Sequence, residues 1–332
     1  MRIVVTGATG FIGVHLARLL REQNHDVVAT GRVEFPAEKT RAETLQREGI
    51  ELRAGSLLTL GFPAQLVNGC DAVIHLAAAQ HEGNVPDSYF HDVNVSAHRV
   101  LLEAAVSAGV RRFVYGSTIG IYGSAINGML DEQTTPRPEN VYARTKLEAE
   151  VVTAEYAGRI ETCIARISET YGPGDLRLLK LFRGIDNGAF FMIGNGRNLR
   201  QVIYVEDLVR GLLLGATQPE AVGQTVVLAG TEIMTTNEMV QQIAAALGRK
   251  SSSLRLPIWP FRAAAAVLEA TLRPMGIQPP LTQRRLDFFT KSFTFSTTKS
   301  RSVLGFVPQV SFAAGAALTA AWYRENGLVG RG

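Results

Sequence analysis

The first turn of the chain reads Thr6-Gly7-Ala8-Thr9-Gly10-Phe11-Ile12-Gly13 and joins a β-branched run at residues 2–6 to a helical pattern at 11–21. In such a turn Gly7 permits a tight bend, Gly10 lets the backbone approach a pyrophosphate, and Gly13 allows close packing of helix and strand. The N-terminus of the following helix adds a positive dipole. The stretch therefore predicts a dinucleotide-binding site, formed by Gly7, Thr9, Gly10, Phe11, Ile12 and Gly13.

Short β-branched runs alternate with longer helical patterns through the first half of the chain. The expected strands are residues 2–6, 26–30, 50–54, 72–76, 112–116 and 162–166, and the expected helices are 11–21, 96–107 and 142–156. This alternation predicts βαβ units and a parallel sheet, in an α/β fold of the Rossmann-type doubly wound class. We expect a dinucleotide-binding domain over residues 1–170.

The alternation weakens after the turn Gly172-Pro173-Gly174. Helical patterns at 236–247, 261–272 and 312–325 lie among segments of mixed type. They predict a smaller mixed substrate-binding lobe over residues 171–332. The two parts are expected to interleave, because residues 202–205 and 226–228 have the composition of strands that could return to the sheet.

The composition of the 332-residue chain is that of a globular protein, with 46% apolar and 19% charged residues. Disorder, collagen and coiled coil are excluded. No run reaches the ~18–20 uncharged apolar residues of a membrane span, and the first residues do not resemble a signal peptide, so we expect a cytoplasmic protein. Cys70 and Cys163 have neither disulfide-framework nor metal-ligand spacing, so no metal site is expected.

Charge is distributed unevenly along the chain. The net charge is +4, but residues 241–332 carry 12 Lys and Arg against 3 Asp and Glu. This basic lobe fits an anionic ligand or a membrane surface, and it fits equally a basic face that is only solvated. The expected partner is a small-molecule substrate, with no nucleic acid.

The residues at the end of the second expected strand distinguish NAD-binding from NADP-binding sites. A carboxylate there would bind the adenosine ribose, but the chain has Gly31-Arg32. A guanidinium that can bind a phosphate, with no acid to repel it, favours NADP over NAD. Two alternatives remain open, because Arg32 could lie over the adenine ring and Glu34 is near enough to bind the ribose.

Tyr142 and Lys146 are four residues apart, so on a helix both side chains project from one face. An ammonium beside a phenol favours the phenolate, which could take a proton from a substrate alcohol while hydride leaves the same carbon. The strand at residues 112–116 runs into Ser117-Thr118, at the carboxyl end of the sheet. A hydroxyl there can share the substrate oxygen with Tyr142.

With these residues the chain resembles the extended short-chain dehydrogenase/reductase family, that is, the NAD-dependent epimerase/dehydratase group. The resemblance covers nearly the whole sequence and rests on the glycine turn, His75-Leu76-Ala77-Ala78, Asn94, Ser117-Thr118, Tyr142 with Lys146, Arg166, Tyr171-Gly172-Pro173-Gly174, Arg200, Tyr204-Val205-Glu206-Asp207 and Trp322-Tyr323.

The resemblance implies a role for each matching residue. Thr118 would be the catalytic hydroxyl, with Ser117 as a second candidate, Tyr142 the acid and base, and Lys146 the residue that binds the nicotinamide ribose and tunes Tyr142. The cofactor would be lined by Leu76, Ala77 and Ala78, and Asn94 would support the helix beneath the site. For His75 a packed core histidine is at least as plausible as a catalytic role.

Two departures from the family pattern bear on the reaction. Ile119-Gly120 occupies the places of the Asp-Glu pair that dehydratases use, so dehydration is not expected and reversible hydride transfer at a secondary alcohol remains, either as epimerisation or as net redox. Arg200 matches the family's phosphate-binding arginine, which favours a nucleotide sugar. Glu169 replaces the family's substrate-binding Asn, and its carboxylate would repel a diphosphate.

Two other functions remain compatible with the sequence. Residues 257–281 resemble the hydroxysteroid-dehydrogenase-like branch, whose substrates are apolar alcohols, although these residues also fit plain core packing. A non-catalytic dinucleotide-binding protein is a further alternative. As in the family, a homodimer is expected through two helices per subunit, residues 93–107 and 142–156.

Overall fold

The computed structural model describes residues 1–80, 85–123, 128–272, 275, 277 and 279–330. Its centre is a seven-stranded sheet in the order β12-β7-β5-β4-β1-β2-β3, and every neighbouring pair of strands is parallel. The strands are β1 (Arg2–Thr6), β2 (Asp26–Thr30), β3 (Glu51–Leu52), β4 (Ala72–His75), β5 (Arg112–Thr118), β7 (Glu161–Ile167) and β12 (Gln224–Leu228). The strand order reverses between β1 and β4, and the glycine turn lies at this crossover, where doubly wound folds bind ligands.

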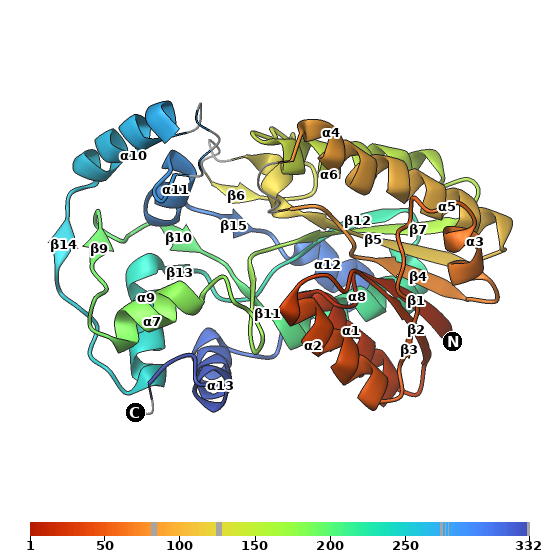
Figure 1. Ribbon diagram of the computed structural model, residues 1–332, viewed down its shortest axis with the longest axis horizontal. Coiled ribbons are helices and arrows are strands. Elements are labelled where there is room, and N and C mark those ends of the chain that lie inside the picture. The colour runs from red at the N-terminus through yellow and green to blue at the C-terminus, as the bar shows by residue number, and fades with distance from the viewer. Residues whose placement is uncertain (81–84, 124–127, 273–274, 276, 278, 331–332) are drawn as a thin grey trace.

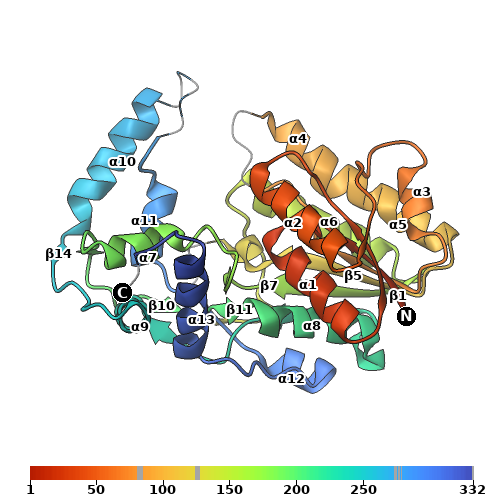
Figure 2. The same ribbon diagram turned by 60° about the horizontal axis from the view of Figure 1, so that its bottom comes forward.

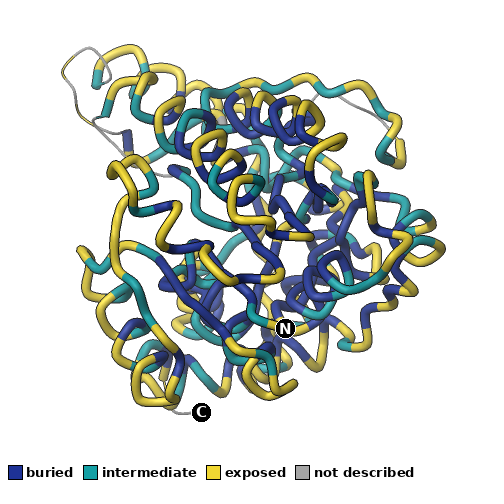
Figure 3. Tube along the Cα trace, turned by 90° about the vertical axis from the view of Figure 1, so that its right-hand side faces the viewer, coloured by how far each residue is buried: buried dark blue, intermediate teal, exposed yellow. Residues whose placement is uncertain are grey.

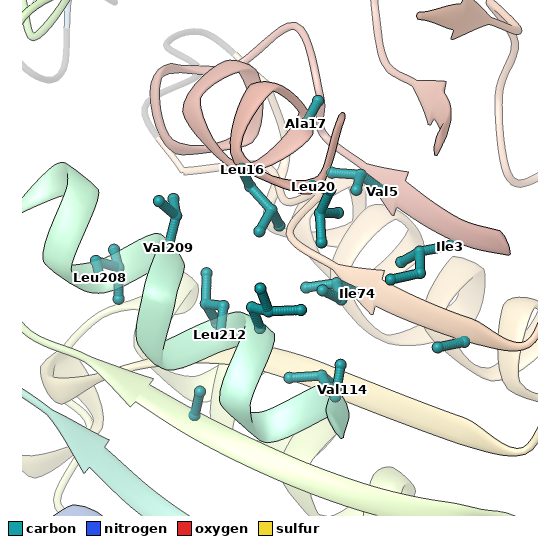
Figure 4. Packing of buried hydrophobic residues seen from close by; sticks show 14 of the residues in the cluster. Ile3, Val5, Leu16, Ala17, Leu20, Ile74, Val114, Leu208, Val209 and Leu212 are labelled. Atoms are coloured by element: carbon teal, nitrogen blue, oxygen red, sulfur yellow. The ribbon is translucent and has the colours of Figure 1, made fainter. Parts of the chain in front are cut away.

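Alternate residues of the strands point to opposite faces of the sheet and contribute to two hydrophobic layers. Ile3, Val5, Ile74 and Val114 face α1 (Phe11–Glu22) and α8 (Val205–Thr217), as Figure 4 shows. Val4, Val73 and Phe113 face the layer built from α3 (Phe62–Val67), α5 (Ala97–Ser107) and α6 (Val141–Glu155). Both faces of the sheet are thus buried, which explains why its strands are almost continuously apolar.

Further helices flank the sheet. They are α2 (Pro36–Arg47), α4 (Asp87–His91), the π-helical segment Asp92–Ser96 that runs into α5, and α12 (Thr298–Leu304). Figure 3 shows the buried strands beneath the half-exposed helices. Among the residues that the structure describes, no helix combines the length and apolar character that crossing a membrane requires.

The second lobe lies beside the sheet (Figures 1 and 2) and has its own cluster of buried hydrophobic side chains. It contains α7 (Leu179–Asp186), α9 (Thr236–Leu247), α10 (Ile258–Leu272), α11 (Gln283–Thr290) and α13 (Phe312–Glu325). Two-residue strands pair with one another around them: β8 (Thr170–Tyr171) with β11 (Ile203–Tyr204), β9 (Met192–Ile193) with β14 (Arg255–Leu256), β10 (Leu199–Arg200) with β13 (Met234–Thr235), and β6 (Met129–Leu130) with β15 (Thr294–Phe295).

The expected return of the chain to the sheet occurs at one of the two predicted places. β12 pairs with β7, as the composition of residues 226–228 suggested. Residues 202–205 do not join the large sheet, because Ile203 and Tyr204 pair with β8 and α8 begins at the next residue. The expected strand at 50–54 is reduced to Glu51–Leu52 at the sheet edge.

Candidate active site

A cleft of about 1920 Å³ runs from the carboxyl ends of the central strands to the second lobe. The glycine turn forms one end of it. Gly7 has φ of +68°, and a Cβ there would lie 2.8 Å from the backbone nitrogen of Ala77. A Cβ on Gly13 would lie 2.1 Å from the carbonyl oxygen of Gly7, so helix α1 can reach the turn only without a side chain at this position. Thr9, Gly10, Phe11 and Ile12 also line the cleft, and the turn fits a dinucleotide pyrophosphate at the N-terminus of α1.

Two cations that the sequence did not reveal flank this turn. The Arg41 guanidinium donates to the carbonyl oxygens of Thr9 (3.3 Å) and Gly174 (3.1 Å). Arg177 lies over the ring of Phe11, with 5.8 Å from guanidinium to ring centroid. Both line the cleft, and both come from segments distant in sequence, α2 and the loop after β8. No local motif could have identified them.

The end of β4 forms the wall opposite the turn. Leu76, Ala77 and Ala78 line the cleft as expected. The hydroxyl of Thr6 accepts hydrogen bonds from the backbone N–H groups of Leu76 and Ala77, both at 3.1 Å, and contacts His75 Nδ1 at 2.7 Å. His75 itself is buried and stacks on His98. Burial, with Lys146 nearby, lowers the pKa of His75 to about 3, so this residue is a neutral core histidine that does not line the cleft.

Arg32 lies at the cleft with carboxylates close by. Its guanidinium is 3.6 Å from Glu38 and 3.3 Å from the hydroxyl of Tyr89, and it lies 5.7 Å from the ring centroid of Phe35. Glu34 lines the same part of the cleft. A side chain at the preceding Gly31 would crowd Thr9, because a Cβ there would lie 2.3 Å from the Thr9 hydroxyl oxygen and 3.1 Å from its backbone nitrogen.

Helix α6 carries the Tyr142–Lys146 pair into the cleft. The helix begins where the side chain of Asn140 accepts a hydrogen bond from the backbone N–H of Ala143 (3.0 Å). Tyr142 and Lys146 then follow one turn apart, and both line the cleft. Lys146 is buried, donates to the carbonyl oxygen of Gly116 (2.6 Å) and lies 4.1 Å from the Tyr115 ring centroid. Burial lowers the pKa of Lys146 to about 7, partly offset by Glu150.

The two hydroxyl candidates at the end of β5 have different surroundings. Ser117 is buried and donates to Glu150 at 2.5 Å. Glu150 is paired in turn with Arg166 (2.8 Å), so Ser117 belongs to a buried network between the sheet and α6. Thr118 is half-buried at the cleft, and its hydroxyl oxygen accepts the backbone N–H of Gly120 (3.1 Å), which leaves its proton for another partner. The geometry favours Thr118 as the hydroxyl that meets a substrate.

Asn94 lies in the π-helical segment and is buried. Its amide accepts from the backbone N–H of Ala79 (2.7 Å) and donates to the carbonyl oxygen of Ala79 and the hydroxyl of Thr145. It therefore joins the loop after β4 to α6, the supporting position expected from the sequence. In the described part of the chain, no group of three or more His, Cys, Asp or Glu side chains is placed to hold a metal ion.

At the far end of the cleft, Arg200 and Glu169 form an ion pair. One guanidinium nitrogen of Arg200 lies 3.0 Å from each carboxylate oxygen of Glu169. The arginine also donates to the carbonyl oxygen of Phe288 (2.6 Å) and lies over the Phe288 ring, 4.5 Å from its centroid. Arg200 is 2% exposed and Glu169 is 50% exposed. The sequence predicted both residues at the substrate, but not that they would neutralise each other.

A doubly wound sheet with this glycine turn, and with a hydroxyl, a tyrosine and a lysine facing one cleft, defines a dinucleotide-dependent enzyme of the short-chain dehydrogenase/reductase type. The model of the NAD dependent epimerase/dehydratase family matches residues 3–230. The chain belongs to this family, as an extended short-chain dehydrogenase/reductase.

Relatives of the chain act on chemically different substrates. It is 30% identical over 329 residues to the 2-alkyl-3-oxoalkanoate reductase of Stenotrophomonas maltophilia, covering 95% of this chain and 97% of the relative. It is 28% identical over 344 residues to 3beta-hydroxysteroid-dehydrogenase/decarboxylase isoform 1 of Arabidopsis thaliana, covering 94% and 77%. A solved structure of MoeE5 with UDP-glucuronic acid and NAD is 27% identical, with a TM-score of 0.76 and coverage of 98% and 100%.

Proposed function

We propose that this enzyme catalyses NAD(P)-dependent, reversible hydride transfer at a secondary alcohol of a nucleotide sugar, as an epimerase or a ketoreductase. One observation carries the proposal: Thr118, Tyr142 and Lys146 all line one cleft, which the glycine turn and Arg200 also line. Its volume of about 1920 Å³ exceeds the roughly 300–1,000 Å³ of a typical small-molecule pocket, which leaves room for a dinucleotide and a substrate together.

The side chains define the proton chemistry. Tyr142 removes the proton of the substrate hydroxyl in the oxidative direction and returns it in the reductive direction. Thr118 donates a hydrogen bond to the same oxygen and stabilises its negative charge. Lys146, with a pKa lowered by burial to about 7, supplies the nearby positive charge that favours the phenolate of Tyr142. When bound, the nicotinamide supplies the hydride acceptor or donor.

The residues next to Thr118 argue against elimination. Ile119 and Gly120 begin a short 3-10 helix, and Ile119 is buried. Neither residue can serve as the acid or base that a dehydratase needs at this position. The proposed reaction therefore ends at hydride transfer, with or without inversion of the alcohol.

Three finer points belong to the same proposal. We propose NADP as the preferred dinucleotide, since Arg32 and Arg41 both line the cleft near the turn. We propose a homodimer through α5 and α6, where Val100 and Val151 are exposed. The cytoplasmic location expected from the sequence stays a prediction.

A second candidate substrate, an apolar alcohol, is favoured by the Arg200–Glu169 pair. Glu169 already satisfies the charge of Arg200, so a diphosphate must displace this carboxylate, whereas a neutral substrate leaves the pair intact. The chain also resembles relatives named for steroid and oxoalkanoate substrates.

The experiment compares both substrate classes on one preparation. UDP- and dTDP-sugars, hydroxysteroids and long-chain hydroxy acids are incubated with NAD or NADP, and the products are separated by chromatography because an epimerase gives no net change in reduced cofactor. Interconversion of a nucleotide sugar, lost in Tyr142→Phe, supports the first candidate. Turnover of apolar alcohols alone supports the second, and no turnover of either class by a cofactor-binding protein overturns the proposal.

A further inference from the structure

Glu150 follows Lys146 by one turn on helix α6, and both residues are buried, at 6% and 2% exposure. Side chains four residues apart on a helix are neighbours on one face. Opposite charges at this spacing act on each other more strongly in the interior than at a surface, because the effective dielectric constant is lower there. Glu150 therefore places a negative charge beside the lysine of the reaction centre.

Two strands of the central sheet hold the carboxylate of Glu150 in place. Ser117 of β5 donates to its Oε1 at 2.5 Å. Arg166 of β7 donates to Oε2 through a terminal nitrogen at 2.8 Å, and its Nε lies 3.2 and 3.3 Å from the two carboxylate oxygens. The other terminal nitrogen of Arg166 donates to the hydroxyl of Tyr122 and the carbonyl oxygen of Glu132. Both partners of the buried ion pair are thus fixed.

The same network joins Glu150 to the strand that carries the acceptor of Lys146. Lys146 donates to the carbonyl oxygen of Gly116, and the next residue, Ser117, donates to Glu150. Consecutive residues of β5 therefore bind side chains from consecutive turns of α6. Thr118 follows directly at the end of the same strand, so Glu150 also fixes the strand segment that leads to the catalytic hydroxyl.

The charge balance around Lys146 depends on Glu150. The other titratable or charged groups on the elements packed around Lys146 are Tyr142 on α6, Tyr115 on β5, His75 on β4, His98 on α5 and Arg166 on β7. Burial keeps both imidazoles neutral by lowering their pKa values, and it raises the pKa of Tyr115. Burial also lowers the pKa of Lys146 to about 7, and the charge of Glu150 acts in the opposite direction.

We propose that Glu150 is a positioning residue of this enzyme, whose carboxylate keeps the buried ammonium of Lys146 charged beside Tyr142. Without this carboxylate Lys146 loses its proton more readily, and a neutral amine does not favour the phenolate of Tyr142. The charge of Lys146 depends on Glu150 whatever the substrate, whereas the consequence for turnover rests on the proposed function. Ser117 and Arg166 contribute by holding the carboxylate.

Nuclear magnetic resonance of lysine labelled with ¹³C at Cε measures the charge of Lys146 without turnover. The chain has six lysines, and Lys146→Met identifies the Lys146 signal by its loss. In Glu150→Gln the midpoint of the Lys146 titration should fall by about one pH unit, a roughly tenfold change in its protonation equilibrium. Glu148→Gln is the matched control, because Glu148 lies on the same helix but is half-exposed beside His91, and the midpoint should not change.

The pH profile of kcat/KM measures the consequence for turnover. A fall of about one unit predicts that Glu150→Gln loses about five-fold in kcat/KM at pH 7 and less than about two-fold near pH 5.5, because Lys146 is mostly protonated in both enzymes at the lower pH. A purely structural role of Glu150 would lower kcat/KM by a similar factor at every pH.

Glu150→Gln leaves the buried cation of Arg166 without its counter-charge, so a second variant combines it with Arg166→Gln. The Lys146 midpoint should still fall in this double variant, because the charge that acts on Lys146 is that of Glu150. A folded variant in which Lys146 titrates as in the wild type overturns the proposal. Failure of both variants to fold also overturns it, since Glu150 would then serve the fold alone. A lowered midpoint in a protein whose wild type turns over neither substrate class supports the role of Glu150 and refutes the proposed function.

Discussion

Replacing Lys146 with methionine is expected to abolish activity and stabilise the folded protein. The ammonium is buried and donates a hydrogen bond to the carbonyl oxygen of Gly116, with the ring of Tyr115 beside it. The two neighbouring imidazoles carry no negative charge that could compensate the ammonium, and burial lowers the pKa values of His75 and His98 so that both rings stay neutral. Glu150 offsets only part of the cost.

The size of the effect follows from the pKa of Lys146. Its fall from 10.5 to about 7 corresponds to about 5 kcal/mol of unfavourable free energy for the charged form in the folded state. Methionine removes this cost but leaves the Gly116 carbonyl without its donor, a loss of about 1–3 kcal/mol, and loses the contact of the ammonium with Tyr115, worth about 1 kcal/mol. We expect a net gain of about 1–3 kcal/mol at pH 7.

The gain in stability from Lys146→Met should decrease as pH rises above 7. Below pH 7 Lys146 is protonated in both the folded and the unfolded chain, so the folded wild type carries the full cost. Between pH 7 and 10.5 the folded chain releases the proton while the unfolded chain keeps it, and the cost falls as pH rises. The advantage of Lys146→Met should therefore shrink toward zero near pH 9.

Urea unfolding of the cofactor-free proteins at pH 7 and pH 9 measures both quantities. Lys39→Met, at an exposed position of α2, is the matched control and should show no such pH dependence. A Lys146→Met protein that is less stable than wild type at pH 7, or whose stability difference is the same at both pH values, would refute the reasoning.

Three further predictions concern the cleft. Thr118→Ala should lower kcat about 10²-fold, and Tyr142→Phe should abolish turnover while cofactor affinity stays within a few-fold of wild type. Ser117→Ala loses a hydrogen bond to buried Glu150 and should mainly lower the unfolding midpoint. If Ser117→Ala lowers kcat as much as Thr118→Ala does, the catalytic hydroxyl is that of Ser117. Arg32→Asp should reverse an NADP preference, and titration of both dinucleotides checks it, with tighter NAD binding by the wild type counting against the proposal. Glu169→Gln should tighten binding of free UDP about ten-fold, measured by calorimetry, and unchanged affinity would show that the carboxylate does not compete for Arg200.

Local sequence patterns predicted the parts of the molecule that depend on short-range periodicity. The glycine turn and the strands at residues 2–6, 26–30 and 112–116 were predictable because both sheet faces are buried and the strands are correspondingly apolar. Helix α2 was not predicted, since it buries only Ala42 and Leu45 and shows no apolar stripe.

The parts of the site that the sequence did not predict depend on contacts between residues far apart in the chain. Tyr142 and Lys146 lie on one helix, so their spacing predicts their common face. Arg41 and Arg177 reach the glycine turn from other elements, and the bond between Arg200 and Glu169 spans 31 residues. Residue types alone indicate that such groups can bind an anion, but only the fold decides whether an internal carboxylate already occupies the cation.

The spacing of three side chains along helix α6 fixes the direction in which each of them points. Tyr142, Lys146 and Glu150 follow at four-residue intervals, and because each interval exceeds a full turn by about 40°, the three side chains fan out around the axis by about 80°. Tyr142 is partly exposed at the cleft, Lys146 is buried in the cleft wall, and Glu150 is buried in an ion pair with Arg166. Deleting one residue between Tyr142 and Lys146 would turn one part of this series by about 100° against the other, so insertions and deletions in α6 should be far less tolerated than substitutions on its outer side.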